Sequence, residues 1–399
     1  MAMTMALQAL AIDAMLPALG EIARDLHVTD PNQRQLIVGV FLFAAGLGAL
    51  IPGALADRYG RRPVLLGSLA LYVLLSLGCA LAPDFDSLLI MRAAQAIGSA
   101  GVSVLPGAII RDRHSGDGMA RMLSTISVVF MLVPMLAPSL GQAVLLIAGW
   151  RWIFALLAVL GVVLTGWVAL RLPETLRPEY QQPILPLAIL RNMARASLNR
   201  AAFGYVIGGS LVYGALFGYI NSSQQLVSEH FGAGVWFPLI FAGTALAMAM
   251  ASFSNSRIVE RFGARRVSHT ALLAFIAVSA LQVALASQEQ EPLWQFMPVM
   301  ATIMFLFGFL GANFGSISLQ PFARMAGAAS SVQAFLRMII GAGLGVVIGQ
   351  AFDGTARPLA GAFLVCGLIT LGLVLFSERG RLFRRIHPPG TQRPVIDLH

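Results

Sequence analysis

The sequence predicts an all-α integral membrane protein whose twelve transmembrane helices form two related six-helix halves. Three observations predict this fold class: the composition, the number of long apolar segments, and an internal repeat. The 399 residues are 57% hydrophobic and only 11% charged, which leaves too little polar surface to cover a water-soluble protein of this length. A lipid bilayer is therefore the expected surroundings of the chain.

Twelve apolar segments are long enough to cross a bilayer, which takes about 20 residues of α-helix. They cover residues 1–19, 34–56, 63–82, 86–110, 119–147, 152–170, 201–226, 236–253, 267–287, 295–321, 329–352 and 358–376. The first has no charged region before its apolar run and contains Asp13, so we interpret it as a span and not as a cleaved signal peptide.

The polar, arginine-containing segment 171–200 separates six spans from six more. We therefore expect an N-terminal bundle (1–170), a cytoplasmic linker (171–200), a C-terminal bundle (201–376) and a cytoplasmic tail (377–399). All 27 basic residues are arginines, and with a cytoplasmic N-terminus only Arg24, Arg34, Arg151 and Arg357 fall in outer loops. Arginines concentrate on the cytoplasmic side of membrane proteins, which predicts that both termini lie there. Because these residues are dispersed, we expect no nucleic-acid partner.

A short charged motif occurs once in each half. Asp57-Arg58-Tyr59-Gly60-Arg61-Arg62 follows the second span, and Glu260-Arg261-Phe262-Gly263-Ala264-Arg265-Arg266 follows the eighth. Secondary transporters are commonly built from such repeats, with the substrate site between the halves. The repeat therefore favours a transporter of small molecules.

The first copy of this motif also carries a family resemblance. The segment GALADRYGRRPVLL at 53–66 resembles the loop signature of the major facilitator superfamily. The chain more narrowly resembles Bcr/CflA-type drug:proton antiporters through AIDAMLPAL at 11–19, IMRAAQAIG at 90–98, the pair Arg111-Asp112, GWRWIF at 149–154, LPETL at 172–176, NSR at 255–257 and AGAASS at 326–331. This resemblance implies the major facilitator fold, alternating access in the inner (cytoplasmic) membrane, and proton-driven multidrug efflux of small amphipathic compounds.

The fifth span departs from the antiporter pattern. Drug antiporters of this family carry a Gly-rich GPxxGG ending here, whereas this chain reads VPMLAPSLGQ at 133–142. Pro134, Pro138 and Gly141 keep the ability to bend the helix, so we expect a hinge in this span.

Asp13 is the one acidic residue that falls well inside a predicted span. Placing a carboxylate inside the membrane costs free energy, so such a residue is by default a candidate functional residue. Asp13 and Arg92 both lie roughly 9 Å from the outer ends of their spans, so an ion pair, direct or through water, is possible. Burial favours a protonated carboxyl and a nearby guanidinium favours a carboxylate, so Asp13 could bind and release a proton while Arg92 modulates it. A static ion pair is the alternative.

Other polar residues inside the predicted spans are weaker candidates. Gln95 could hydrogen-bond a substrate or a neighbouring helix. Tyr213, Phe217 and Asn221 share one face of the seventh span, where they could line a substrate cavity or contact lipid. Asn313 is a further cavity candidate, and we expect Arg337 to bond either Asn313 or backbone carbonyls in a structural role.

The first loop motif predicts a gate on the cytoplasmic side. By resemblance, Asp57 meets Arg61, Asp112 and the N-terminal end of the eleventh span near Ala328, with Arg58 and Arg62 beside them. A carboxylate is stabilised at a helix N-terminus, which makes this closure physically sound. The alternative is that these arginines only set the topology.

No catalytic motif, nucleotide-binding loop or metal-ligand spacing occurs in the sequence, so we expect neither an enzyme nor a metal site. Cys79 and Cys366 lie in separate apolar segments, which suits buried free thiols. We expect a monomer with no cofactor beyond the proton as coupling ion. The main alternative is a proton-coupled or facilitative importer of a specific small solute.

Overall fold

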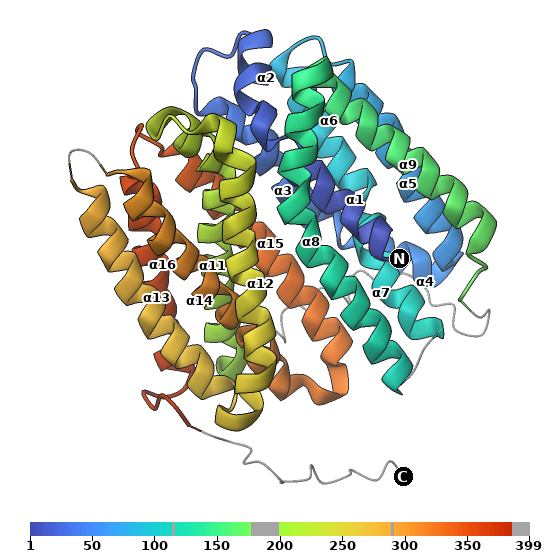
Figure 1. Ribbon diagram of the computed structural model, residues 1–399. Helices are drawn as coiled ribbons and strands as arrows, with labels where there is room; N and C mark the ends of the chain where they lie inside the picture. The colour runs from blue at the N-terminus through green and yellow to red at the C-terminus, as the bar shows by residue number, and fades with distance from the viewer. Residues whose placement is uncertain (114–115, 177–198, 289–290, 385–399) are drawn as a thin grey trace, which may run out of the picture.

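The computed structural model describes residues 1–113, 116–176, 199–288 and 291–384 (Figure 1). These ranges form helices and loops, without a β-strand. The first half comprises α1 (Ala2–Asp13), η1 (Leu16–Ala18), α2 (Leu19–Asp25), η2 (Gln33–Gln35), α3 (Leu36–Gly48), α4 (Ile51–Tyr59), α5 (Arg61–Ala80), α6 (Phe85–Gly98), α7 (Ala100–Arg113), α8 (Gly116–Ala148) and α9 (Arg151–Arg171). The second half comprises α11 (Arg200–Gln225), η4 (Leu226–His230), η5 (Gly234–Trp236), α12 (Phe237–Phe262), α13 (Ala264–Ala286), α14 (Leu293–Leu319), η6 (Gln320–Met325), α15 (Ala326–Gln350) and α16 (Arg357–Ser377).

A helix or helix pair coincides with every apolar segment that the sequence predicts to span the membrane. Within the described residues, ten helices are long and apolar enough to cross a bilayer, and α3 with α4 make an eleventh span bent by 41°. The predicted fifth span coincides with α8, whose shorter stretch Leu132–Ala148 is apolar. α12 continues to Phe262, beyond the apolar segment, because a helix can extend past the hydrocarbon layer into water. The linker prediction falls largely on 177–198, outside the described residues.

Large apolar side chains cover the outer surface of both bundles. Leu170 and Ile147 are each 86% exposed and Leu81 is 80% exposed. A water-soluble protein rarely presents apolar area on this scale, whereas lipid tails surround such side chains without cost. Helices suit these surroundings because every backbone group within them is paired internally.

The repeat recognised in the sequence has the same backbone geometry in both halves. Gly60 precedes α5 with φ +105°, and Gly263 precedes α13 with φ +84°. Residues with a side chain rarely adopt these angles, which explains a glycine at both positions. At the position of Arg61 the second copy has Ala264, so the ion pairs of Arg61 have no counterpart there.

Two helix pairs join the halves, α3 with α15 and α8 with α12. Figure 1 shows α3 and α15 between the two groups of helices. The glycines of α3 allow a close approach: a Cβ on Gly39 would lie 2.3 Å from Val346 Cγ2. Gly46 similarly faces Met338 and Ile339 of α15.

Candidate transport site and gates

Asp13 lies where the first span is broken. α1 ends at Asp13, and η1, which contains Pro17, leads into α2. Proline lacks an N–H donor, so Pro17 cannot make the helical hydrogen bond to the carbonyl four residues earlier, that of Asp13. The span continues to Asp25, so Asp13 lies near its middle, deeper than the expected position close to Leu19. Its side chain is 5% exposed and has no hydrogen bond or ion pair among the described residues.

Arg92 does not form a direct ion pair with Asp13, one of the two arrangements that the sequence allowed. The Arg92 side chain is fully buried, its Nη2 donates to the Ala11 carbonyl at 3.1 Å, and its Nε donates to the Ile37 carbonyl at 3.3 Å. Arg92 therefore contacts the first span through the backbone carbonyl of Ala11 and not through the Asp13 carboxyl. The coupling roles of both residues stay predictions.

Gln95 is held between helices. It accepts a hydrogen bond from Arg92 Nη1 at 2.8 Å and donates one to Ser76 Oγ of α5 at 2.7 Å. The Gln95 side chain is completely buried, which agrees with the helix-to-helix alternative. Contact with a substrate would require a conformation in which these bonds are broken.

α8 passes through Pro134 and Pro138 as one continuous helix. Gly141, one turn further on, packs directly against the first span. A Cβ at this position would lie 1.7 Å from the carbonyl oxygen of Ala14. α8 thus contacts the chain at the residue that follows Asp13. The proposed hinge stays a prediction, but its glycine lies beside the break in the first span.

The three cavity candidates of α11 have different surroundings. Tyr213 lies edge-on to Phe307, with ring centroids 4.9 Å apart, and lines a pocket. Phe217 instead packs against Gly341 and Gly345 of α15. Asn221 is 1% exposed, and neither atom of its amide has a hydrogen-bond partner among the described residues. Of the three, Tyr213 is the residue that lines the pocket between α11, α14 and α15.

Asn313 and Arg337 do not bond each other. Asn313 Nδ2 donates to Asn255 Oδ1 at 2.7 Å and to the Phe309 carbonyl at 2.9 Å, which occupies both of its amide hydrogens inside the bundle. Arg337 lies instead over the Tyr213 ring, 4.8 Å from its centroid. The expected structural hydrogen bonds of Arg337 are thus absent from the described part of the chain.

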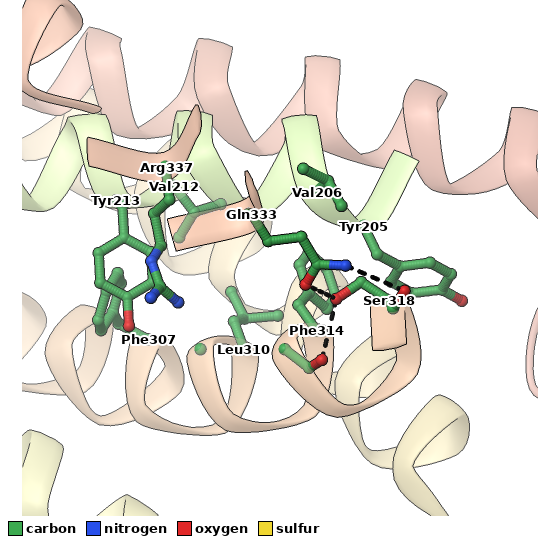
Figure 2. Close-up of a pocket in the computed structure, with 13 residues that line it drawn as sticks. Tyr205, Val206, Val212, Tyr213, Phe307, Leu310, Phe314, Ser318, Gln333 and Arg337 are labelled. Carbon is green, nitrogen blue, oxygen red and sulfur yellow. Dashed lines mark hydrogen bonds between the residues drawn. The ribbon is translucent and has the colours of Figure 1, made fainter. Parts of the chain in front are cut away.

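A pocket lies between α11, α14 and α15, with Arg337 and Tyr213 at one end (Figure 2). At the other end Ser318 Oγ donates to Gln333 Oε1 at 2.8 Å, and Gln333 Nε2 donates to the Ser318 carbonyl at 3.1 Å. Phe307 and Phe314 contribute aromatic walls. The cavity volume of about 30 Å³ holds a water or two and is too small for a whole drug molecule.

Part of the predicted cluster of loop residues is formed, and its role as a gate stays a prediction. Arg61 pairs with Asp57 at 2.6 Å and with Asp112 at 3.1 Å. Arg62 instead donates to the Ala169 carbonyl, and Arg58 stacks on the neighbouring Tyr59 ring. Among the described residues, none of these bonds crosses to α15, so the cluster belongs to the first half in this conformation. The Arg111 and Ala328 side chains lie outside the described residues.

Glu174 is a member of this cluster that the motif analysis did not assign. Partial burial acts to raise the pKa of its carboxyl, but hydrogen bonds from the backbone N–H groups of Leu176, Arg61, Thr175 and Arg62 outweigh burial and hold the pKa below its usual value. The bonds to Arg61 and Arg62 cap the N-terminus of α5. The segment LPETL was noted in the sequence, but its contact with Gly60 and α5 requires the fold.

A polar seal joins the two halves at the ends that the predicted topology places outside. Asn32 Nδ2 donates to the carbonyls of Gln350 and Phe352, Gln350 Nε2 donates back to the Asn32 carbonyl, and Gln225 Nε2 donates to Asn32 Oδ1. Gln35 also bonds Gln225. We call this group, together with the Arg34–Glu229 ion pair, the outer seal.

Sequence reasoning did not assign these residues to a site, because partners roughly 200 or 320 residues apart leave no local pattern. Every hydrogen bond between the two halves in the described residues belongs to the outer seal. The conformation is therefore closed at the end that the predicted topology places outside.

Comparison with known proteins agrees with this architecture. The family model described as Major Facilitator Superfamily matches residues 1–346. The chain is 28% identical to "Bicyclomycin resistance protein homolog" of Haemophilus influenzae, covering 90% of each chain, and 28% identical to "Multidrug resistance protein MdtL" of Shigella dysenteriae, covering 93% and 92%.

Among solved structures, a peptide transporter crystallised with sulfate matches with a TM-score of 0.75 at 13% identity, covering 95% of this chain and 94% of that one. A D-xylose-proton symporter matches with a TM-score of 0.72 at 15% identity, covering 96% and 98%. At these identities the structural matches bear on the fold alone. By the family match, the chain is a multi-pass membrane transporter of the Major Facilitator Superfamily, not an enzyme.

Proposed function

We propose that this transporter exports drugs or small amphipathic metabolites in exchange for protons, by alternating access. The observation that carries the proposal is the Asp13 carboxyl, buried at a break in the first span without a partner among the described residues. Such a group can gain and lose a proton when the surrounding helices move. Relatives named for bicyclomycin and multidrug resistance support export as the direction.

The outer seal suits one conformation of the proposed transport cycle, the one that is closed at the outer end. With the outer ends of α3, α11 and α15 bonded together, a substrate would enter from the opposite, arginine-rich end. Breaking the seal while the Asp57 cluster closes onto α15 would turn the site outward. In this proposal the protein acts as a monomer in the cytoplasmic membrane, with both termini in the cytoplasm and the proton as its only coupling partner.

The test uses everted membrane vesicles from an efflux-deficient host and a panel of anionic, neutral and cationic dyes that includes ethidium. We expect dye uptake driven by an imposed proton gradient, its loss with an uncoupler, and its loss in Asp13→Asn. Asp86→Asn, which removes an exposed carboxylate at the start of α6, is the matched control and should retain uptake. Full gradient-driven uptake by a normally folded Asp13→Asn variant would exclude the coupling role.

The importer alternative gives the opposite result in this assay. An importer would move the dye or solute out of everted vesicles and raise its accumulation in intact cells. Export lowers accumulation in intact cells, and the uncoupler restores it.

A further inference from the structure

Arg337 carries a charge in the middle of α15 that no protein group neutralises within the described residues. Three other arginines have polar partners: Arg34 pairs with Glu229, Arg265 pairs with Glu378, and Arg92 donates to two carbonyls and to Gln95. Arg337 makes no hydrogen bond and no ion pair there. Placing a charged group inside the membrane costs free energy, and such groups are usually paired. We therefore expect the partner of Arg337 to be a ligand that binds and dissociates.

The surroundings of Arg337 suit an aromatic anion. Its guanidinium lies 4.8 Å from the Tyr213 ring, and a cation over an aromatic face is attracted to it while its N–H edge stays available. Figure 2 shows the guanidinium at one end of the pocket, beside Tyr213 and Phe307. The pocket continues along Leu310 and Phe314 towards Gln333 and Ser318.

We propose that this pocket recognises the anionic group of the transported compound, and that Arg337 binds it. The substrate class is then an amphipathic compound with an aromatic body and one carboxylate. The carboxylate accepts two N–H bonds from the guanidinium, and the aromatic body packs against Tyr213 and Phe307. The inference deepens the proposed function and rests on it.

The cavity dimensions agree with this division of the ligand. A volume of about 30 Å³ accommodates a carboxylate but not the aromatic body, so the side chains of Tyr213 and Phe307 must move before the aromatic body packs against them. Gln333 and Ser318 lie nearer the arginine-rich end of α14 and α15 than Arg337 does. A substrate that enters from that end would reach Gln333 and Ser318 first, where it can exchange hydrogen bonds with them, and would reach Arg337 second.

A purely structural role makes a different prediction. If Arg337 only attached α15 to α11 through the Tyr213 ring, its removal would weaken the fold. The affinity for a ligand would then not depend on the charge of the ligand. The decisive comparison is therefore between two ligands of the same shape that differ in charge. 2-Naphthoate and 2-naphthamide are such a pair.

The experiment measures equilibrium binding of tritiated 2-naphthoate to the full-length protein in lipid nanodiscs, without a proton gradient, with 2-naphthamide as competitor. For the wild type we expect naphthoate to bind about tenfold more tightly than the amide, the usual size of a charge-assisted hydrogen-bonded contact. Arg337→Gln should abolish this preference, and Arg337→Lys should retain part of it. Arg257→Gln is the matched control, because Arg257 also lies over a ring, 4.7 Å from that of Phe253, but is exposed and outside the pocket.

Equal affinity of the wild type for acid and amide, including binding of neither, overturns the proposal whether or not the variants fold. An unchanged acid preference in a folded Arg337→Gln variant also overturns it. Because the assay needs no gradient, these results are independent of Asp13. Gradient-driven efflux without an acid preference would leave the proposed function standing and remove this inference alone.

Discussion

Gln35 Nε2 donates a hydrogen bond to Gln225 Oε1 at 2.8 Å, joining the start of α3 in the first half to the end of α11 in the second. Both side chains are almost completely buried, 2% and 3% exposed. Asn32 accepts a further bond from the same Gln225 amide. Alternating access requires these bonds to break, and because each neutral hydrogen bond contributes only about 0.5–1.5 kcal/mol, thermal motion can open the seal reversibly.

Gly349→Ala should weaken the outer seal. A Cβ at Gly349 would lie 2.0 Å from Gln35 Oε1, and the Gln35 amide cannot move aside without disturbing its bond to Gln225. In a background without Cys79 and Cys366, we expect faster maleimide labelling from the outside of a cysteine placed at the buried position Ser223. Gly343→Ala, also on α15, meets nothing within 4 Å and should label at the parental rate. Equal rates in both variants would show that Gln35 does not hold the seal.

Gly141→Ala should destabilise the fold by separating α8 from the first span. The added Cβ would lie 1.7 Å from the backbone oxygen of Ala14, which cannot rotate away as a side chain could. Overpacking of this kind costs about 1–3 kcal/mol. Thermal unfolding in detergent should show a clear drop in Tm, whereas Gly166→Ala, where an added Cβ meets nothing within 4 Å, should not lower it. A wild-type Tm for Gly141→Ala would contradict the close contact.

Asp57→Asn should shift the balance between the two end states. Asp57 and Asp112 both pair with Arg61, so removing one carboxylate leaves that cluster with excess positive charge and weakens closure at the inner end. We expect faster labelling of cysteines placed on the inner half of the cavity wall. Arg58→Gln, a change in the same loop at an arginine that only stacks on Tyr59, is the control. If Asp57→Asn labels like the control, the loop sets topology and does not gate.

Acidification should remove the contribution of Glu174 to stability. Because its pKa in the folded protein lies below the usual value of 4.5, the carboxylate stabilises the fold at and above that pH and loses this effect as the pH falls through the folded-state pKa. Glu174→Gln should therefore have a lower Tm than the wild type at pH 7, and the difference should shrink below pH 4.5. A Tm difference that does not change with pH would contradict a role for the charge.

The spans and the repeat were predictable from sequence because both depend on local patterns. A run of apolar residues is recognisable without its neighbours, and Gly60 and Gly263 share a motif that predicts the same turn. The cluster of Asp57, Arg61 and Asp112 followed from a family motif, which carries tertiary information from many related proteins.

The pairing of intramembrane polar groups was not predictable in the same way. Asp13 and Arg92 were expected at similar depths, but Arg92 bonds the Ala11 and Ile37 carbonyls instead, because packing decides how each helix is placed and rotated. The break at Pro17 also extends the first span to Asp25, which changes the depth of Asp13. Arg337 was expected to bond Asn313 or backbone carbonyls, yet it lies over the Tyr213 ring, and the Asn313 amide donates to Asn255 of α12. Only the folded bundle reveals these partners.

The outer seal carries no net charge. Its members are neutral amides, apart from Arg34 and Glu229, whose charges cancel. The membrane potential does about 2.3 kcal/mol of work per 100 mV on each elementary charge that crosses the full field. Opening this seal moves almost no net charge through that field, so the membrane potential has little effect on it. In the proposed cycle, voltage sensitivity therefore arises from the proton on Asp13 and from the charge of the substrate, and a neutral substrate should give a different current per turnover from an anionic one.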